Sequence, residues 1–265
     1  MNNKYILGVI FCFINLFFNG CFYEEESNEN KLLDSLEDKE NIIDSIPNQL
    51  IIVLTNDSND INGYLYRYEG NKNNWSLQGN MIDVTIGKKG MAKGRGIEIG
   101  NSANLVDKIE GDGKTPSGIF TIGDAFGFQP IEKIKGIKLN YLPIDSFSRC
   151  IEDAESMYYN KIVQINKVNK DWDIADKMRN VELYEWGFFV NHNTPSLYNS
   201  GSCVFFHIWR GPNRYTLGCT AMSKENILKL LYWIDPIKNP LIIQYVISDY
   251  NKISSKLNLP DIILP

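Results

Sequence analysis

Short apolar runs of strand length recur along most of the chain, and turns rich in glycine and asparagine separate them. Residues 49–55 read QLIIVLT, a run rich in isoleucine and valine that predicts a buried strand. Residues 63–69 alternate aromatic and polar positions, as a strand with one exposed face does. Further strands are predicted at 75–78, 81–86, 119–122, 184–190, 203–209 and 241–247. Evenly spaced short strands favour a mainly β (α+β) fold, built as a β-sandwich or barrel-like sheet with a few short helices.

Two segments have helical patterns. From Ser223 to Asp235 the apolar residues recur at helical spacing on one face, so this is the clearest predicted helix. Ser223 can cap its N-terminus, and Pro236 ends it. Asp171 to Arg179 also predicts a short helix.

Residues 1–20 have the pattern of an export signal. Lys4 precedes an apolar stretch from Ile6 to Phe18, which is shorter than the roughly 20 residues that span a bilayer and suits the core of a signal peptide. The stretch ends in Phe18-Asn19-Gly20-Cys21, which resembles a bacterial lipobox, where the cysteine becomes the lipid-bearing first residue. We therefore expect an exported lipoprotein of the periplasm or cell envelope, membrane-anchored through Cys21. An uncleaved anchor and ordinary signal cleavage are the alternatives.

Charge is concentrated in one segment. The net charge is −5, and residues 22–48 alone hold nine acidic residues against two lysines. Such a segment is typical of a solvated spacer, so residues 21–48 are predicted to be an acidic tether. The remaining residues, 49–265, form one predicted catalytic domain that is close to neutral and offers no electrostatic footprint for nucleic acid.

Sequence motifs for nucleotide binding, metal binding and glycoside cleavage are incomplete or absent in this chain. Gly113-Lys114-Thr115 ends like a phosphate-binding loop, but Lys108 stands where that loop requires glycine. Gly94, Gly96 and Gly100 miss the dinucleotide spacing by one residue. The only histidines are His192 and His207, with no clustered metal-ligand pattern, and no acidic pair stands out for glycoside cleavage. No metal and no cofactor are expected.

The segment from Gly201 to Ser223 carries the candidate chemistry. Strand alternation places Cys203, Phe205, His207 and Trp209 on one face. A loop then leads to Thr216-Leu217-Gly218-Cys219. His207 can take the thiol proton of Cys219, and backbone N–H groups around Gly218 and Cys219 can stabilise an oxyanion. Taken alone, such a pattern more often reflects a histidine packed in the core and a Gly-Cys dipeptide without catalytic meaning.

This segment resembles the active-site strand and loop of the L,D-transpeptidase family with the YkuD-type catalytic domain, which carries a His, a loop and then Ser/Thr-x-Gly-Cys. Residues 111–120 resemble the family's GDGKTPxGxF segment. Residues 150–160, with Cys-Ile-Glu-Asp and Tyr-Asn, and Gly201-Ser202 resemble segments of one subgroup. The likeness covers roughly residues 49 to 247. Two positions depart from the family: Leu217 stands where His is most common, and Ala221 where Asn or Arg is frequent.

The resemblance implies a peptidoglycan L,D-transpeptidase. Cys219 would attack tetrapeptide stems, release D-alanine and form a thioester, with His207 as base and Gly218 shaping the oxyanion site. An amine acceptor would then give a cross-link or attach a protein to the wall. The alternatives are an L,D-carboxypeptidase with the same Cys/His pair, a catalytically silent peptidoglycan-binding lipoprotein and, ranked below these, a zinc peptidase.

For several residues near this segment, the sequence leaves more than one role open. Arg210 could bind a substrate carboxylate or be a solvated loop cation, and Trp209 could line a peptide groove or pack. Thr216 could bond the histidine or shape the turn, and it is counted with Arg210 and Trp209 among the candidate substrate-binding residues. His192 is interpreted as structural. Cys203 is interpreted as a packing residue or as the disulfide partner of Cys150.

Overall fold

The computed structural model describes residues 47–71, 74–97 and 105–265. The predicted signal peptide over 1–20, the predicted lipid-attachment residue Cys21 and all but the last two positions of the acidic tether lie outside the described residues. Within the described residues, no helix combines the length and the apolar character that crossing a membrane requires.

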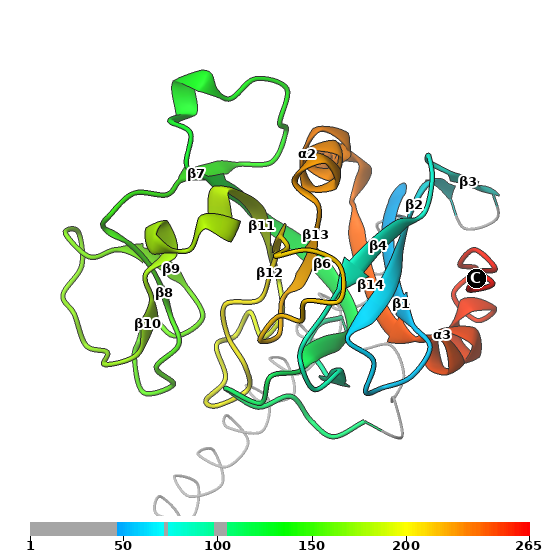
Figure 1. Ribbon diagram of the computed structural model, residues 1–265, viewed down its shortest axis with the longest axis horizontal. Coiled ribbons are helices and arrows are strands. Elements are labelled where there is room, and N and C mark those ends of the chain that lie inside the picture. Colours follow the sequence, from blue (N-terminus) through cyan, green and yellow to red (C-terminus); the bar gives the residue numbers. More distant parts are fainter. Residues whose placement is uncertain (1–46, 72–73, 98–104) are drawn as a thin grey trace, which may run out of the picture. The chain divides into compact units, whose positions relative to one another are not determined.

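An eleven-stranded sheet forms the centre of the domain. Its strands are β1 (Gln49–Thr55), β2 (Asn62–Asn71), β3 (Asn74–Leu77), β4 (Ile82–Thr85), β5 (Met91–Lys93), β6 (Thr115–Gly127), β7 (Tyr141–Pro143), β11 (Trp186–Val190), β12 (Phe205–Ile208), β13 (Thr220–Met222) and β14 (Leu241–Val246). Neighbouring strands follow the order β1-β14-β6-β11-β12-β13-β4-β2, and β2 pairs again with β1, so the sheet closes on itself (Figure 1). This closed arrangement confirms the predicted mainly β, barrel-like fold class.

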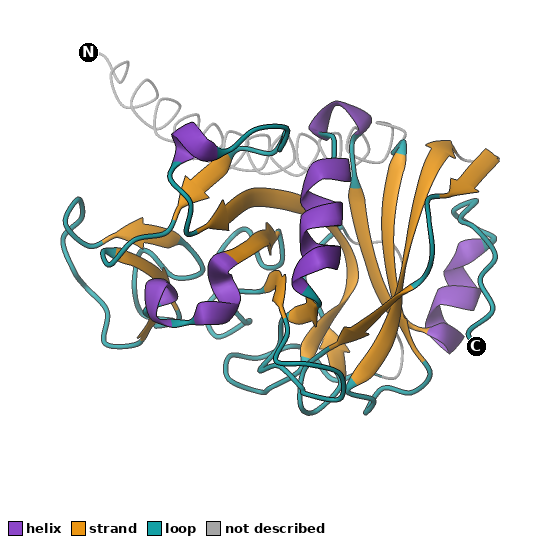
Figure 2. Ribbon diagram, turned by 45° about the horizontal axis from the view of Figure 1, so that its top comes forward, coloured by secondary structure: helices purple, strands orange, loops and turns teal. Residues whose placement is uncertain are grey.

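Two helices, α2 (Lys224–Trp233) and α3 (Ile247–Ser254), pack at separate places on the sheet (Figure 2). Their positions explain why β1 is buried along its whole length. Because strand side chains alternate between faces, Ile51 and Val53 join the cluster that contains Leu230 of α2, whereas Leu50 joins the cluster that contains Tyr250 of α3. An apolar run without alternation is therefore a strand with both faces covered.

The helix α2 confirms the helix predicted from Ser223. The Ser223 hydroxyl oxygen accepts a hydrogen bond from the Asn226 backbone nitrogen at 3.3 Å, which satisfies a donor of the first turn. The helix ends at Trp233, and Pro236 begins a short 3-10 turn, η4 (Pro236–Lys238).

A second, three-stranded sheet is inserted between β7 and β11. Its strands are β8 (Ser148–Ile151), β9 (Ile162–Gln164) and β10 (Ala175–Asp176), and three 3-10 turns lie near it in the chain, η1 (Ile131–Lys133), η2 (Met178–Asn180) and η3 (Glu182–Glu185). A disulfide joins Cys150 of β8 to Cys203, which precedes β12. Of the two roles considered for Cys203, pairing with Cys150 is the one found, and it ties the second sheet to the central one.

The helix predicted over residues 171–179 is wrong, because these residues form β10 and η2. The Asp171 carboxylate accepts a hydrogen bond from the Ser156 hydroxyl at 2.6 Å, and the Asp173 backbone nitrogen donates to the Asp153 carboxylate at 2.7 Å. β10 then pairs with β8. Hydrogen bonds to residues 150–156 replace the local backbone hydrogen bonds that a helix would form, so tertiary contacts override helix propensity here.

Two strand boundaries also differ from the prediction. Tyr184 lies in η3, and β11 begins only at Trp186. Cys203 has a φ of 52°, which is left-handed rather than extended, and β12 therefore begins at Phe205. β13 was not predicted, because three residues between the Cys219 turn and α2 are too few to show a period.

Candidate active site

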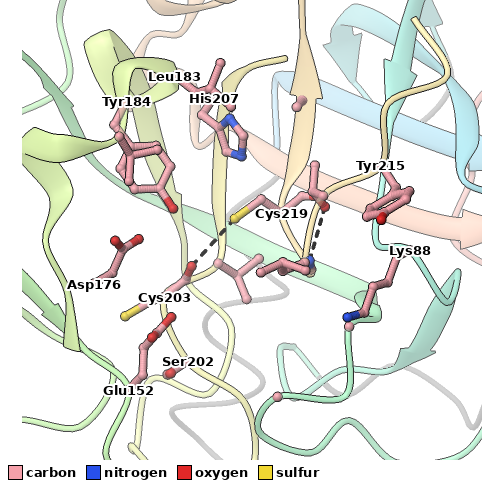
Figure 3. A pocket seen from close by; sticks show the side chains of 18 of the residues that line it. Lys88, Glu152, Asp176, Leu183, Tyr184, Ser202, Cys203, His207, Tyr215 and Cys219 are labelled. Atoms are coloured by element: carbon pink, nitrogen blue, oxygen red, sulfur yellow. Dashed lines mark hydrogen bonds between the residues drawn. The ribbon is translucent and has the colours of Figure 1, made fainter. Parts of the chain in front are cut away.

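The parallel pairing of β12 and β13 brings the two predicted catalytic residues together. His207 on β12 lies in register with Ala221 on β13. Cys219 directly precedes β13, and its Sγ lies 3.4 Å from the Phe205 backbone nitrogen of β12. Figure 3 shows the His207 imidazole turned toward the Cys219 sulfur. Both side chains line one cavity of about 760 Å³, which is large enough for a small ligand.

The alternation predicted for this strand is confirmed. Phe205 packs in the cluster that includes Cys203 and borders Cys219, whereas Phe206 packs in the cluster beneath α2. His207 follows the side of Phe205 and so faces the cavity.

Two threonine hydroxyls hold the turn that carries the thiol. Thr216 Oγ1 donates to the Cys219 carbonyl oxygen at 2.6 Å and accepts from the Gly218 backbone nitrogen at 3.1 Å. Thr115 Oγ1 donates to the same carbonyl oxygen at 3.2 Å. The backbone nitrogen of Thr216 is itself bonded to the Ile86 carbonyl oxygen at 2.8 Å. Thr216 therefore shapes the turn, which is one of the two roles considered for it.

Gly218 occupies a position that requires glycine. Its φ is 150°, a conformation that other residues rarely adopt, and an added Cβ would lie 3.1 Å from the Lys114 carbonyl oxygen. Its N–H already donates to Thr216. Of the two predicted oxyanion donors, the Gly218 N–H is therefore used within the turn, and the Cys219 N–H is the candidate that remains.

The hydrogen bonding of His207 selects its tautomer. Nδ1 lies 2.7 Å from the Ile208 carbonyl oxygen, which can only accept, so Nδ1 carries the proton. In the neutral ring, Nε2 then presents its lone pair. Tyr184 packs edge-on against the imidazole, with 5.2 Å between ring centroids, and supports its orientation. This tautomer is the one a proton acceptor requires.

Burial keeps the thiol and the imidazole neutral. It lowers the pKa of His207 to about 4. Burial also raises the pKa of Cys219 to about 12; the Phe205 N–H lowers that pKa, while the carboxylates of Asp176 and Glu152 raise it. At neutral pH the pair is therefore a thiol and a free imidazole, and the reactive thiolate must form during the reaction itself.

Two carboxyl groups from the second sheet and its adjoining loop form one wall of the same cavity, Glu152 and Asp176 (Figure 3). Burial raises the pKa of Glu152 to about 7, and the nearby charges of Asp176 and Glu110 add to the effect. Burial likewise raises the pKa of Asp176, against the effect of a hydrogen bond from Tyr184. The wall next to the thiol is therefore acidic.

The predicted substrate-binding residues Arg210 and Trp209 both line the cavity. The Arg210 guanidinium donates to the Tyr215 carbonyl oxygen at 2.9 Å and lies 5.8 Å from the centre of the Tyr215 ring. Because Arg210 is exposed, it keeps further donors for a ligand at the rim.

His192 does not line the cavity of Cys219 and His207, and both of its ring nitrogens bond to the backbone. Its Nε2 donates to the Ser200 carbonyl oxygen at 3.0 Å, and its Nδ1 accepts from the Arg95 backbone nitrogen at 3.1 Å. With both nitrogens used inside the fold, His192 connects three segments of backbone. Throughout the described part of the chain, no group of three or more His, Cys, Asp and Glu side chains could hold a metal ion.

Sequence reasoning missed several contributors. Thr115 belongs to the segment that resembles the family's glycine-rich motif, but nothing in the sequence connects its hydroxyl to the Cys219 turn. Nothing in the sequence indicated that Asp176 lies near Cys219, because the helix predicted over residues 171–179 did not place it at the active site. The backbone groups of Cys203 and Phe205 that contact the sulfur are also absent from any residue pattern.

Comparison with known proteins identifies the family. The family model described as the L,D-transpeptidase catalytic domain, YkuD, matches residues 50–243. No curated protein sequence matches the chain. Two crystal structures of the helical cell shape determining protein Pgp2 from Campylobacter jejuni, one of them of a mutant, are similar to this chain, with low sequence identity and low TM-scores. The mutant is 17% identical with a TM-score of 0.37 and the other is 15% identical with a TM-score of 0.33.

These two matches cover 75% and 78% of this chain but only 48% and 55% of the Campylobacter chains, so the chain spans about half the length of those proteins. The assignment rests on the family match, which extends over most of the described domain. The chain therefore belongs to the YkuD family of L,D-transpeptidase catalytic domains, a family of peptidoglycan enzymes.

Proposed function

We propose that this protein is a peptidoglycan L,D-transpeptidase that works through a thioester on Cys219. The observation that carries the proposal is that a cysteine thiol outside any disulfide and the lone-pair edge of His207 meet in one cavity. The family assignment supplies the substrate class, which is the stem peptides of peptidoglycan.

The acylation step follows from the protonation states. The Cys219 sulfur bonds to the carbonyl carbon of the third stem residue while its proton passes to Nε2 of His207. The negative charge that develops on the carbonyl oxygen is stabilised by donors such as the Cys219 N–H; a single such donor is worth about 3 kcal/mol. The bond to D-alanine then breaks, and His207 returns the proton to the leaving amine. A thioester and free D-alanine are the products.

The second step decides between two activities. If an amine attacks the thioester, Cys219 is regenerated; the product is a cross-link when the amine belongs to another stem, and a protein joined to the wall when the amine belongs to that protein. If water attacks, the product is a tripeptide and the enzyme is an L,D-carboxypeptidase. The nucleophile and base are the same in both, and only access of the acceptor differs.

The test is incubation of the full-length protein, in detergent, with disaccharide-tetrapeptides, followed by mass analysis of the products. Dimers with loss of D-alanine support transfer, and tripeptides support hydrolysis by the same pair. Unchanged tetrapeptide, with no mass gained by the protein after exposure to a carbapenem, would overturn the enzymatic proposal in favour of a silent wall-binding protein.

Thr216→Val is expected to reduce kcat about tenfold while leaving KM nearly unchanged. The valine has a similar shape but loses the hydroxyl that bonds the Cys219 carbonyl oxygen and the Gly218 nitrogen. Small displacements of a nucleophile cost rate rather than binding; an error of about 1 Å can cost 10²-fold. Steady-state kinetics on the tetrapeptide measure the effect. Thr216→Ser is the matched control, and a loss of equal size in that variant would contradict the role assigned to the hydroxyl.

We also propose that the protein is exported and held in the cell envelope by a lipid on Cys21. The apolar stretch before Cys21 supports this, and so does the Cys150–Cys203 disulfide, since disulfides persist in oxidising compartments. Cys21→Ala is expected to move the protein from the membrane fraction to the soluble fraction, as followed by immunoblotting of fractionated cells. Persistence in the membrane fraction would favour an uncleaved anchor instead.

A further inference from the structure

We infer that the Cys150–Cys203 disulfide is a positioning element of the active site, which fixes the backbone segment that holds the Cys219 sulfur in place. The inference deepens the proposed function, and its turnover measurement rests on that function. Its second measurement, the chemical reactivity of Cys219, does not.

Two backbone groups from one short segment hold the sulfur. The Phe205 nitrogen donates to Cys219 Sγ at 3.4 Å. Sγ in turn donates to the Cys203 carbonyl oxygen at 3.7 Å (Figure 3). The carbonyl favours the protonated thiol, and the N–H favours the thiolate. Both groups belong to the stretch that leads into β12, so the location of this stretch determines where the sulfur lies relative to His207.

The stretch has an unusual backbone conformation that needs support. Cys203 has a φ of 52°, which lies in the left-handed region that few residues other than glycine adopt. Two anchors restrain it. Its side chain is bonded to Cys150, and its backbone nitrogen donates to the Asn160 side-chain oxygen at 2.9 Å. Without the disulfide, the Cys203 side chain loses its anchor, and the carbonyl that faces Sγ is positioned only through hydrogen bonds of the surrounding backbone, such as the one to Asn160.

The same covalent bond locates the acidic wall. Cys150 lies directly opposite Asp176 in the β8–β10 pairing, and Glu152 follows Cys150 by two positions. Both carboxyl groups line the cavity with Cys219. A single disulfide therefore links the strand pair next to the acidic wall to the segment that contacts the sulfur, although the two belong to different sheets.

Loosening this link has opposite effects on turnover and on simple thiol reactivity. The ionisable groups that face Cys219 are His207, Tyr184, Asp176, Glu152 and, at longer range, Lys108. Burial is the main reason that the Cys219 pKa is raised. A loosened segment admits water, which lowers that pKa, and each unit of decrease raises the thiolate fraction at pH 8 about tenfold. Alignment with His207 is lost at the same time, and this slows turnover.

The experiment compares the full-length wild type with the Cys150→Ala/Cys203→Ala double variant. We expect kcat on disaccharide-tetrapeptides to fall roughly 10- to 100-fold with KM nearly unchanged. Alkylation of Cys219 by iodoacetamide at pH 8, located by peptide mass, should instead become several-fold faster. Treating the wild type with a dithiol reductant should reproduce both changes, and reoxidation should reverse them. Gln164→Ala, which removes a β9–β8 side-chain bond but keeps the disulfide, is the matched control and should behave as wild type.

Two results would overturn the inference. One is wild-type kcat and wild-type alkylation in the reduced or doubly substituted protein. The other is a decrease of both rates in proportion to the loss of folded protein measured by circular dichroism, which indicates a purely structural bond. If the wild type itself makes no product, the proposed function fails, and faster alkylation after reduction still decides whether the disulfide holds the sulfur.

Discussion

Cys219→Ser is expected to lower tetrapeptide turnover by at least about 10³-fold while leaving the fold intact. Serine has the same shape as cysteine with a smaller terminal atom, and its hydroxyl has the same ability to accept from the Phe205 nitrogen and donate to the Cys203 carbonyl oxygen. Its hydroxyl, however, ionises far less readily than a thiol. Burial already raises the pKa of the Cys219 thiol to about 12, and the same burial disfavours an alkoxide, so His207 would have a far weaker acid to deprotonate. Turnover is measured as release of D-alanine from disaccharide-tetrapeptides.

A second readout separates loss of chemistry from loss of binding. The wild type should gain the mass of a carbapenem, because a β-lactam carbonyl acylates the same thiol, and Cys219→Ser and Cys219→Ala should not. Circular dichroism spectra of both variants should match the wild type, since Cys219 forms no disulfide. Mass gain or D-alanine release that persists in Cys219→Ala would place the nucleophile elsewhere and remove the basis of the proposed mechanism.

The parts of the site that sequence predicted are those encoded by local periodicity. Period-two alternation placed His207 and Phe205 on one side of a strand and Phe206 on the other. In the structure Phe205 and Phe206 pack in different clusters, and His207 lines the cavity. The turn at Gly218 and Cys219 was predicted from residue type, because glycine marks a backbone that other residues cannot follow. Local rules of this kind do not depend on which segments lie nearby.

The parts that sequence missed depend on contacts between distant segments. Thr115 reaches the Cys219 carbonyl from β6, and the acidic wall reaches the thiol from an inserted sheet. The failed helix over residues 171–179 has the same cause, since its polar groups bond to residues far away in the chain. Pairing of Cys150 with Cys203 could be offered only as one of two roles for Cys203, because spacing alone does not determine which cysteines meet.

The neutral resting pair also explains why the thiol can remain stable outside catalysis. A thiolate that exists at rest reacts with any oxidant or electrophile, whereas a protonated thiol is a poor nucleophile. Here the raised pKa of Cys219 and the lowered pKa of His207 keep the proton on sulfur until a substrate carbonyl is present. Because no thiolate is present at rest, the reaction depends on His207 more strongly than it would in an enzyme that holds a preformed thiolate–imidazolium pair.

His207→Asn is therefore expected to lower kcat at neutral pH by about 10²- to 10⁴-fold, the range typical of losing a general base. The asparagine amide can still donate to the Ile208 carbonyl oxygen, as Nδ1 does, so the strand end should keep its geometry. What the variant lacks is Nε2, the only atom of His207 that is free to take the thiol proton. Steady-state kinetics on the tetrapeptide measure the loss, and carbapenem acylation should slow by a similar factor.

The pH dependence gives the sharper form of this prediction. Burial lowers the pKa of His207 to about 4, so the imidazole remains a proton acceptor above that value and loses this ability as pH falls through it. Wild-type acylation should then be nearly constant between about pH 5.5 and 9 and decline only below that range. In His207→Asn, thiolate forms only by ionisation of a thiol whose pKa is about 12, so the rate should rise about tenfold per pH unit over the same range. The two profiles should converge toward high pH. A variant profile as flat as that of the wild type would show that His207 does not accept the proton from Cys219, even if its rate were low.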